Sequence, residues 1–299
     1  MGISNITGPP VEGENFFGRE RELASALNHI KKGNSIILSA PRRVGKSSFA
    51  KKLIAIAAAE EWRTLEIDLE EIGSEQKFLE IFVEKLRNAS WWNKTASTAS
   101  DIINHILENT KITIKETATI EWKAKRADLF TRLGKLLNHE DETLIMIDEV
   151  TVLLNRFINI DKENGRENVS FFLYWLRNLR QVSETKIRWI FCSSIGIDNF
   201  TSRHNLSSTF NDVFSFPIGP FDELTTKALL RKLADSDQFL IPDDLIEQIV
   251  SRIGWCLPYF IQVIYFHFHN LSINRKETNS VENIDEAFRE LIESKELNT

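Results

Sequence analysis

The stretch that decides the fold is SIILSAPRRVGKSSF, residues 35–49. Its apolar beginning, residues 36–38, predicts a short buried strand, and the apolar pattern after the following turn predicts a helix. The turn ends in Gly-Lys-Ser at residues 45–47. Strand, turn and helix in this order match the phosphate-binding loop template G-x-x-x-x-G-K-[ST], with Ala40 at the position of the usual first glycine.

Each matched residue of this loop has a physical role. Gly45 lets consecutive backbone N–H groups and the helix N-terminus face one anion. Lys46 reaches the β- and γ-phosphates, and the Ser47 hydroxyl is placed to ligate Mg²⁺. The other residues of the loop that we expect to contact the nucleotide are Pro41, Arg42, Arg43, Val44 and Ser48. The alternative is a chance match in an ordinary strand-to-helix turn.

A second motif lies about one hundred residues downstream, where the apolar run LIMI at residues 144–147 is followed by Asp148 and Glu149. This is how a buried parallel strand delivers acids to its carboxyl end. Asp148 would hold the magnesium ion, and Glu149 would polarise an attacking water. Together with the loop, the acid pair predicts nucleotide binding.

The composition fits a globular protein with one large and one smaller domain, since 42% of the 299 residues are hydrophobic. The net charge of −6 gives no general attraction to DNA or to an acidic membrane. Cys192 and Cys256 have no metal-binding spacing and suit a reducing compartment. The longest apolar run, residues 257–268, is too short to cross a bilayer. A cytoplasmic protein without membrane association is expected.

The N-terminal residues 1–15 are rich in Gly, Pro and Asn and predict an arm. Residues 16–20, FFGRE, lead into an amphipathic helix that ends near Gly33. The two aromatic residues, Phe16 and Phe17, fit either a cover for an adenine base or a hydrophobic staple for that helix.

Further strands and helices alternate up to Pro220, which predicts a parallel α/β sheet with ligands at the carboxyl ends of its strands. Within an insertion at about 90–125 we expect two short strands. Beyond the acid pair and the helical residues that follow it, we expect a mobile polar loop. The expected strands are residues 64–69, 187–191 and 212–216, those of the insertion 111–115 and 119–123, and the loop 159–168.

Several side chains in this part have two interpretations. Trp91 and Trp92, with Lys94, fit a base-stacking platform, although packing is the more usual role of such a pair. Arg177 and Arg180 lie on one helical face, and one of them could act on a neighbour's nucleotide; a solvated or salt-bridged arginine is the alternative.

Two more features concern the ends of the predicted sheet and the region after it. Ser194 follows the strand at 187–191, where a small hydroxyl suits sensing the γ-phosphate or orienting the water. From residue 221 onward the pattern predicts only helices, with Asp243 capping one and Pro258 in the first turn of the next. His267 and His269 face different directions on that helix and do not predict a metal site.

Five motifs in this order resemble those of the archaeal and bacterial AAA-like ATPases of the STAND group of P-loop NTPases, relatives of AAA+ proteins and of origin-recognition initiators. The motifs are FFGRE at 16–20, APRRVGKS at 40–47, LIMIDE at 144–149, SIGI at 194–197 and GWCLPY at 254–259.

The resemblance implies an α/β fold of the AAA type, with a five-stranded parallel sheet of order 5-1-4-3-2 between helices and a C-terminal helical lid. It implies an adenine pocket at Phe17, Gly18 and Arg19, and a lid element that includes Pro258, although Cys256 stands where that element often has glycine. The expected organisation is an arm at 1–15, an NTPase domain at 16–220 and a lid at 221–299.

Two functional hypotheses follow. In the first, the protein binds ATP and Mg²⁺, hydrolyses ATP slowly with Glu149, Lys46 and Ser194 as catalytic residues, and switches conformation to regulate a partner protein or its self-association. In the second, it is a nucleotide-gated module that loads on DNA or a protein with little hydrolysis, supported by the tryptophan pair and by Lys123, Lys125 and Arg126. The net charge does not favour DNA.

Overall fold

The computed structural model describes residues 2–92, 97–110, 118–137, 141–194, 196–275 and 280–293. Its strands are β1 (Ile36–Ser39), β2 (Arg63–Asp68), β3 (Thr143–Asp148), β4 (Ile187–Ser193) and β5 (Phe214–Ser215). The first helices are α1 (Glu20–Lys31), α2 (Lys46–Ala59), α3 (Glu75–Asn88), α4 (Ser97–Thr110), α5 (Ala118–Leu137) and α6 (Val150–Ile160). The later helices are α7 (Gly165–Gln181), α8 (Ile197–Arg203), α9 (Glu223–Ser236), α10 (Asp243–Ile253), α11 (Pro258–Arg275) and α12 (Val281–Glu293).

The chain forms two compact units that are each built from separate parts of the sequence. The first unit comprises the described residues of Met1–Arg21, Pro41–Lys52 and Ile218–Thr299. The second comprises those of Glu22–Ala40 and Leu53–Pro217, and it contains the whole sheet. The predicted division into an arm, an NTPase domain and a lid remains a prediction.

All neighbouring strands of the sheet are parallel, and their order is β2-β3-β4-β1-β5. Read from β5, this is the predicted order 5-1-4-3-2, which is therefore confirmed. β1 ends at Ser39 opposite Ser193 of β4, and Asp68 of β2 lies opposite Asp148 of β3. Polar side chains thus gather at the carboxyl edge of the sheet, as parallel α/β proteins require of a ligand site.

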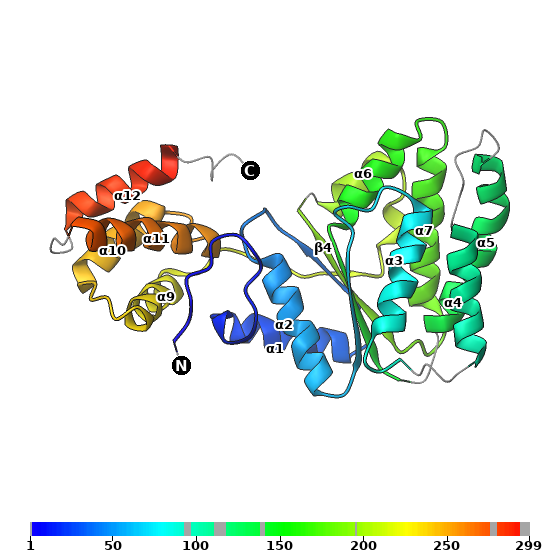
Figure 1. The fold of residues 1–299 in the computed structure, drawn as a ribbon, viewed down its shortest axis with the longest axis horizontal. Coiled ribbons are helices and arrows are strands. Elements are labelled where there is room, and N and C mark those ends of the chain that lie inside the picture. Colours follow the sequence, from blue (N-terminus) through cyan, green and yellow to red (C-terminus); the bar gives the residue numbers. More distant parts are fainter. Residues whose placement is uncertain are drawn as a thin grey trace. The chain divides into compact units, whose positions relative to one another are not determined.

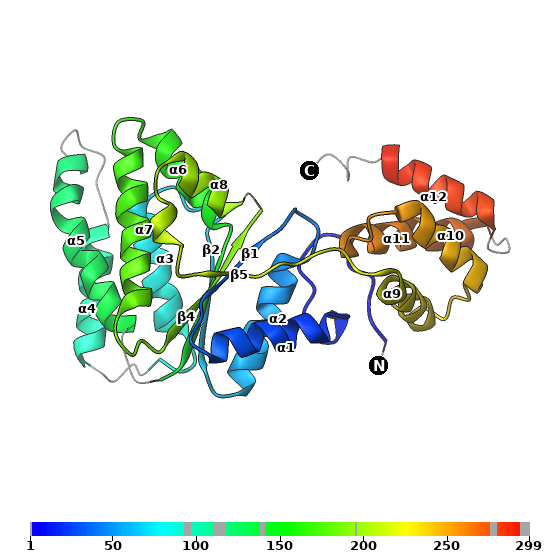
Figure 2. The same cartoon turned by 180° about the vertical axis from the view of Figure 1, so that it is seen from behind.

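Alternate residues of each central strand face opposite sides of the sheet, as the period of two dictates. Ile37, Ile145 and Phe191 join the core beneath α3, α6 and α7, whereas Ile36 and Leu38 are buried outside that cluster. Figure 1 shows α3, α6 and α7 on one side of the sheet, and Figure 2 shows α1 and the end of α2 on the other. Burial on both faces explains why the strands are almost wholly apolar.

The first unit has its own core between α9, α10, α11 and α12. The N-terminal arm belongs to this unit and is tied to its helices. Ile3 is buried, and its backbone N–H donates to Ser236 Oγ at 2.8 Å, while the N–H of Ile6 donates to Gln262 Oε1 at 2.7 Å. The arm therefore packs along the helices that the sequence predicted as a lid.

The structure corrects the predicted insertion. Residues 119–123 are not a strand, because they lie in the first turns of α5; residues 111–115 lie outside the described residues. The buried residues Trp122, Arg126 and Leu133 recur at helical spacing on the side of α5 that faces the core. Their burial outweighs the local β-propensity of the Thr and Ile residues that begin this segment. The sequence also missed α4.

The predicted loop at residues 159–168 is wrong for most of its length. α6 continues to Ile160 and α7 begins at Gly165, so only four residues connect them. The N–H of Gly165 donates to the carbonyl of Asp161 at 2.6 Å, and the Asp161 carboxylate accepts from the N–H of Asn164 at 2.9 Å. Polar composition suggested a mobile loop, whereas these residues form a short turn that starts a helix.

Two smaller corrections concern ends of elements. Asp243 is the first residue of α10 rather than its cap, which is Pro242. The fifth strand is the two-residue Phe214–Ser215 rather than 212–216, although the N–H of Phe216 still donates to the carbonyl of Ile37 at 2.9 Å. Helix and strand ends are the least reliable part of a prediction from sequence.

Candidate functional site

The predicted phosphate-binding loop, residues 41–48, belongs to the first unit and follows β1 by one residue. Gly45 has φ +88°, a left-handed conformation that glycine adopts without strain. α2 begins at Lys46, and the dipole and backbone N–H groups of a helix N-terminus favour an anion. Lys46 is buried, and its Nζ donates to the carbonyl of Pro41 at 3.0 Å, so the ammonium group lies across the loop.

An aromatic contact that the sequence did not suggest joins this loop to α11. Arg43 has φ +71°, and its guanidinium lies 4.6 Å from the ring centre of Tyr259 and 5.3 Å from that of Phe260. These rings directly follow Pro258, the first residue of α11. The loop and the start of α11 are therefore neighbours within the first unit. The two segments are more than two hundred positions apart, so no local pattern could have revealed the contact.

Arg19 is held by the backbone around the loop. Its side chain is buried, and its Nη2 donates to the carbonyls of Val44 at 3.0 Å and Gly219 at 2.7 Å. The guanidinium also lies 4.8 Å from the ring centre of Phe221. Gly18, with φ +69°, packs so closely that a Cβ there would lie 3.1 Å from a methyl group of Thr225. Arg19 thus ties the loop, through the carbonyl of Val44, to the backbone at Gly219.

The other residues that were predicted to contact the nucleotide either contact other parts of the first unit or are partly or fully exposed to solvent. Phe17 packs against the core of α9 to α12, and Lys232 Nζ lies 5.4 Å from its ring centre. Ser48 is buried, and its hydroxyl accepts from the N–H of Val11 at 3.0 Å. Ser47 is half-buried, while Pro41 and Arg42 are exposed.

The acid pair lies in the second unit at the carboxyl end of β3. Asp148 is the last residue of that strand, and its Oδ1 accepts from the N–H of Glu149 at 3.0 Å. Glu149 has φ +52°, which is uncommon for a residue with a side chain and often marks a functional position. The Ser194 hydroxyl donates to Glu149 Oε2 at 2.8 Å. The structure therefore brings together the predicted base and the predicted serine after β4.

A second pair of side chains, both with hydroxyl groups, lies at the carboxyl edge of the sheet. Thr151 Oγ1 and Ser193 Oγ lie 2.8 Å apart and are buried, and so tie the end of β4 to the first turn of α6. No pattern in the sequence pointed to Thr151, and of the two serines that follow Cys192 only Ser194 was predicted as a site residue. β4 also extends two residues further than predicted, through Cys192 and Ser193, which places Ser194 immediately after the strand.

Arg180 does not fit the role of an arginine finger. Its side chain is 3% exposed and donates to both carboxylate oxygens of Asp212, at 2.9 and 3.0 Å, and to the carbonyl of Thr209. Its guanidinium also lies over the rings of Phe191 and Phe210. The salt-bridged alternative is therefore correct for Arg180, and the finger hypothesis stays open only for the half-buried Arg177.

We expect Asp212→Asn to destabilise the protein at neutral pH. Burial alone would raise the pKa of Asp212, but the hydrogen bond and charge of Arg180 hold it below its usual value. A depressed carboxyl pKa contributes stability above the unfolded value of 3.8, and that contribution is lost as the pH falls through the folded value. The expected loss at pH 7 is about 1 kcal/mol, because water still screens the carboxylate.

Thermal unfolding of the parent and of Asp212→Asn between pH 2 and pH 7 measures this effect. The difference in stability should be largest at neutral pH and should shrink as the pH falls below about 4. A difference that stays constant over this range would show that the Asp212 charge is not its source.

The side chains that supported nucleic-acid binding are mostly engaged in other contacts. Trp91 Nε1 donates to the carbonyl of Thr64 at 3.0 Å, and both Trp91 and Trp92 pack against the core of the second unit. Lys123 and Arg126 each bind the carboxylate of Glu167. These contacts favour the packing interpretation of the tryptophan pair, and Lys94 lies outside the described residues.

The fold is similar to several solved structures. A Walker-type ATPase of Pyrococcus abyssi matches with a TM-score of 0.59 and 16% identity, over 96% of this chain and 77% of that chain. Domain III of the replication initiation protein DnaA of Thermotoga maritima matches with a TM-score of 0.53 and 13% identity, over 97% and 96% of the two chains. The ORC1 protein of Aeropyrum pernix, solved in complex with DNA, matches with a TM-score of 0.55 and 12% identity, over 95% and 66%.

Neither the protein-family models nor the curated proteins gave a match to this sequence. At these low identities the similarity to solved structures concerns the fold. The chain shares the fold of these structures, with a five-stranded parallel sheet of order 5-1-4-3-2 covered by helices, which confirms the predicted fold class. Within the described residues, no helix combines the length and apolar character needed to cross a bilayer.

Proposed function

We propose that this protein is a Mg²⁺-dependent ATPase that uses slow hydrolysis to switch its conformation and so regulates a partner protein or its own assembly. The observation that carries the proposal is the hydrogen bond between Ser194 and Glu149 at the carboxyl edge of the sheet. β1 ends at that edge opposite Ser193, and the phosphate-binding loop follows β1 in the sequence. This is the order of elements that phosphoryl transfer by P-loop proteins uses.

The roles proposed for the individual residues follow from their chemistry. Gly45 and the N-terminus of α2 would hold the phosphates, with Lys46 supplying a positive charge. Ser47 and Asp148 would ligate Mg²⁺, which prefers oxygen ligands. Bound there, the ion would neutralise charge that develops on the phosphates.

Glu149 is proposed as the group that orients and polarises the attacking water. Its backbone is left-handed, and the Ser194 hydroxyl fixes one carboxylate oxygen. The other oxygen can then accept a hydrogen bond from water. Ser194 acts on the reaction through Glu149 in this arrangement and is a positioning residue.

The adenine pocket is proposed at the segment Phe17-Gly18-Arg19. In this pocket Arg19 would hold the neighbouring backbone in place, because its guanidinium donates to the carbonyls of Val44 and Gly219. Arg43 stacks on Tyr259 and Phe260, so a change of the loop on nucleotide binding would also move the start of α11. This contact supplies a physical route for the proposed conformational switch.

We expect Asp148→Asn to raise the Mg²⁺ concentration needed for half-maximal ATP turnover by about tenfold or more, because a neutral amide replaces an anionic magnesium ligand. Asp68→Asn is the matched control, since Asp68 ends β2 directly opposite Asp148 and its Oδ1 accepts from the N–H of Glu70 at 2.8 Å. ATP hydrolysis measured over a series of Mg²⁺ concentrations tests both variants.

The proposal would be contradicted by a parent protein that neither binds nor hydrolyses ATP at any Mg²⁺ concentration. If turnover is present but Asp148→Asn and Asp68→Asn have equal magnesium requirements, then Asp148 is not the magnesium ligand. In that case the assignment of the metal site fails while the ATPase proposal stands.

A second candidate function is a nucleotide-gated module that loads on DNA or a protein and hydrolyses little. The similarity to DnaA domain III and to ORC1, which was solved with DNA, favours it. Two of the basic residues that suggested DNA binding, Lys123 and Arg126, are instead paired with Glu167. Titration with duplex DNA over a salt series separates the two functions, because phosphate contacts weaken steeply as salt rises.

A further inference from the structure

The second unit contains a cavity of about 790 Å³ that the proposed ATPase function does not use. It lies between the start of α3, the first turns of α5 and the turn that connects α6 to α7. Apolar side chains of Trp122, Phe157 and Ile160 form part of its lining, and Glu75 is the buried acid among the lining residues. Its size is that of a site for a small organic molecule or an inserted side chain.

Glu75 is the unusual group of this cavity. Its side chain is 3% exposed, and Oε2 accepts from Trp122 Nε1 at 2.7 Å. Oε1 is also buried and has no hydrogen-bond partner among the described residues. A buried carboxylate oxygen without a partner is costly, and native structures seldom keep one without a functional reason. Glu75 therefore requires a hydrogen-bond donor.

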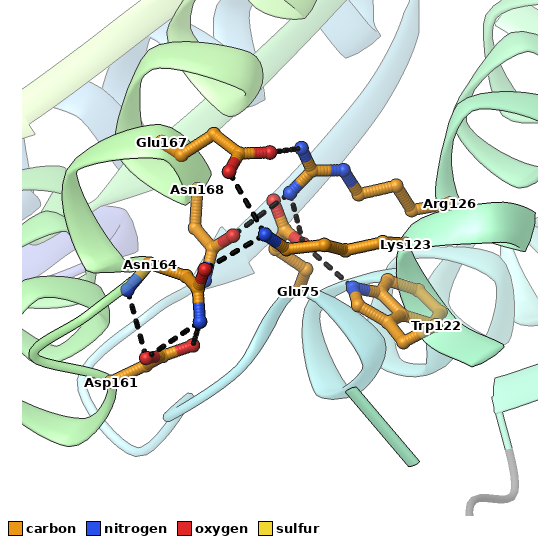
Figure 3. A network of polar contacts seen from close by, with 8 residues as sticks. All are labelled: Glu75, Trp122, Lys123, Arg126, Asp161, Asn164, Glu167 and Asn168. Carbon is orange, nitrogen blue, oxygen red and sulfur yellow. Dashed lines mark hydrogen bonds and ion pairs between the residues drawn. The ribbon is translucent and has the colours of Figure 1, made fainter. Parts of the chain in front are cut away.

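The cationic side chains nearest to Glu75 already form hydrogen bonds and ion pairs with other residues. Arg126 lies 3.7 Å from Glu75 Oε2, but it donates to Asn168 Oδ1 at 2.8 Å and also pairs with Glu167. Lys123 donates to Asn164 Oδ1 at 2.8 Å and to Glu167 Oε2 at 2.9 Å. Figure 3 shows Glu75 between the α5 side chains Trp122 and Arg126 on one side and the α7 residues on the other.

The charges of this network leave room for one more cation. The lining of the cavity carries four acids, Glu75, Glu80, Asp161 and Glu163, and three lysines, Lys77, Lys123 and Lys162. The positive ends of α3 and α7 also lie here, but each already carries an acid in its first turn, Glu75 and Glu167. An anionic ligand would thus meet a buried carboxylate, whereas a cationic ligand would satisfy it.

We propose that this cavity binds a cationic group with N–H donors, an alkylammonium or alkylguanidinium, with Glu75 as its anionic partner. The head group would donate to Glu75 Oε1, and its alkyl chain would pack against Trp122 and Ile160. The same chemistry is offered by a free amine or guanidine and by a lysine or arginine side chain of a polypeptide.

Isothermal titration calorimetry on the full chain tests the proposal, with butylguanidinium chloride as the probe and butylurea as its neutral counterpart. Both molecules have N–H donors and a similar shape, so the comparison isolates the charge. The measurement is made at pH 8 in low salt, because burial raises the pKa of Glu75 and the carboxylate must be ionised. We expect one molecule of butylguanidinium to bind per chain, about tenfold or more tighter than butylurea.

Two variants locate the binding. Glu75→Gln should reduce the preference for butylguanidinium over butylurea to less than about threefold. Glu80→Gln is the matched control, because Glu80 also lines the cavity but is exposed and paired with Lys77, and this variant should keep the preference of the parent. Circular dichroism and thermal unfolding establish that both variants are folded.

Each result of these titrations either supports or overturns the proposed binding of a cationic group at Glu75. It is overturned if the parent binds neither probe, if it binds both equally, or if Glu75→Gln keeps the parent's preference. Should Glu75→Gln fail to fold, the comparison of the two probes on the parent still decides it. Titration with the peptide acetyl-Gly-Arg-Gly-amide distinguishes the sources: binding at least as tight as that of butylguanidinium indicates a polypeptide side chain, and weaker binding indicates a free small molecule.

Discussion

Glu149→Gln should bind ATP with the affinity of the parent and should lose nearly all turnover, by about 10²- to 10⁴-fold, which is the usual contribution of a general base. Glutamine has nearly the same size and can still accept the hydrogen bond that the Ser194 hydroxyl donates at 2.8 Å. It lacks the negative charge that polarises the attacking water. The local structure is thus preserved while the chemistry is removed.

Single-turnover hydrolysis and equilibrium binding of a fluorescent ATP analogue measure the two quantities separately. Ser194→Ala is the companion variant, because it keeps Glu149 but removes the hydroxyl that fixes its carboxylate. We expect Ser194→Ala to reduce the rate less than Glu149→Gln does. Hydrolysis by Glu149→Gln at the parent rate would show that Glu149 is not the base.

Lys46→Ala should weaken ATP binding by about 10- to 100-fold, since a hydrogen bond from a charged donor to the phosphates is removed. In the structure, Lys46 Nζ is buried and donates to the carbonyl of Pro41 at 3.0 Å. The ammonium group is therefore held at the loop before any phosphate arrives. A pre-positioned charge gives affinity at a lower cost in side-chain entropy.

Lys51→Ala is the matched control for this variant. Lys51 lies on the same helix as Lys46, but its ion pair with Glu12 is solvent-exposed, and such pairs contribute little to stability. Binding of ATP should be close to that of the parent. Equal losses of affinity in both variants would point to a general effect of positive charge on α2 and would contradict a specific role for Lys46.

The sequence was sufficient for features that depend on neighbouring residues. The apolar runs that became β1 and β3, and the glycine, lysine and serine after β1, each carry their own pattern within a few positions. The strand order was also predicted correctly, but it came from the resemblance of five motifs and not from the periodicity of the strands. Local pattern fixes the type of an element more reliably than its neighbours in space.

The errors fell in segments whose structure depends on distant contacts. Residues 119–123 have the β-branched residues of a strand, yet they form part of α5, where Trp122 is buried against Glu75 of α3. For Arg180 the sequence left a finger, a solvated and a salt-bridged role open, and its partner Asp212 lies 32 positions away. In both segments a contact with a distant residue decided the structure.

By itself, the sequence determined that the chain would form a parallel α/β sheet with a Gly-Lys-Ser turn after its first strand and an acid pair at the end of its third. Only the tertiary structure decided which side chains meet: Ser194 with Glu149, Arg43 with Tyr259, and Glu75 with Trp122. The physical reason is the separation along the sequence between the residues that interact. Secondary structure and phosphate loops follow from interactions between residues close in sequence, whereas the free energy of a buried polar contact depends on groups that only folding brings together.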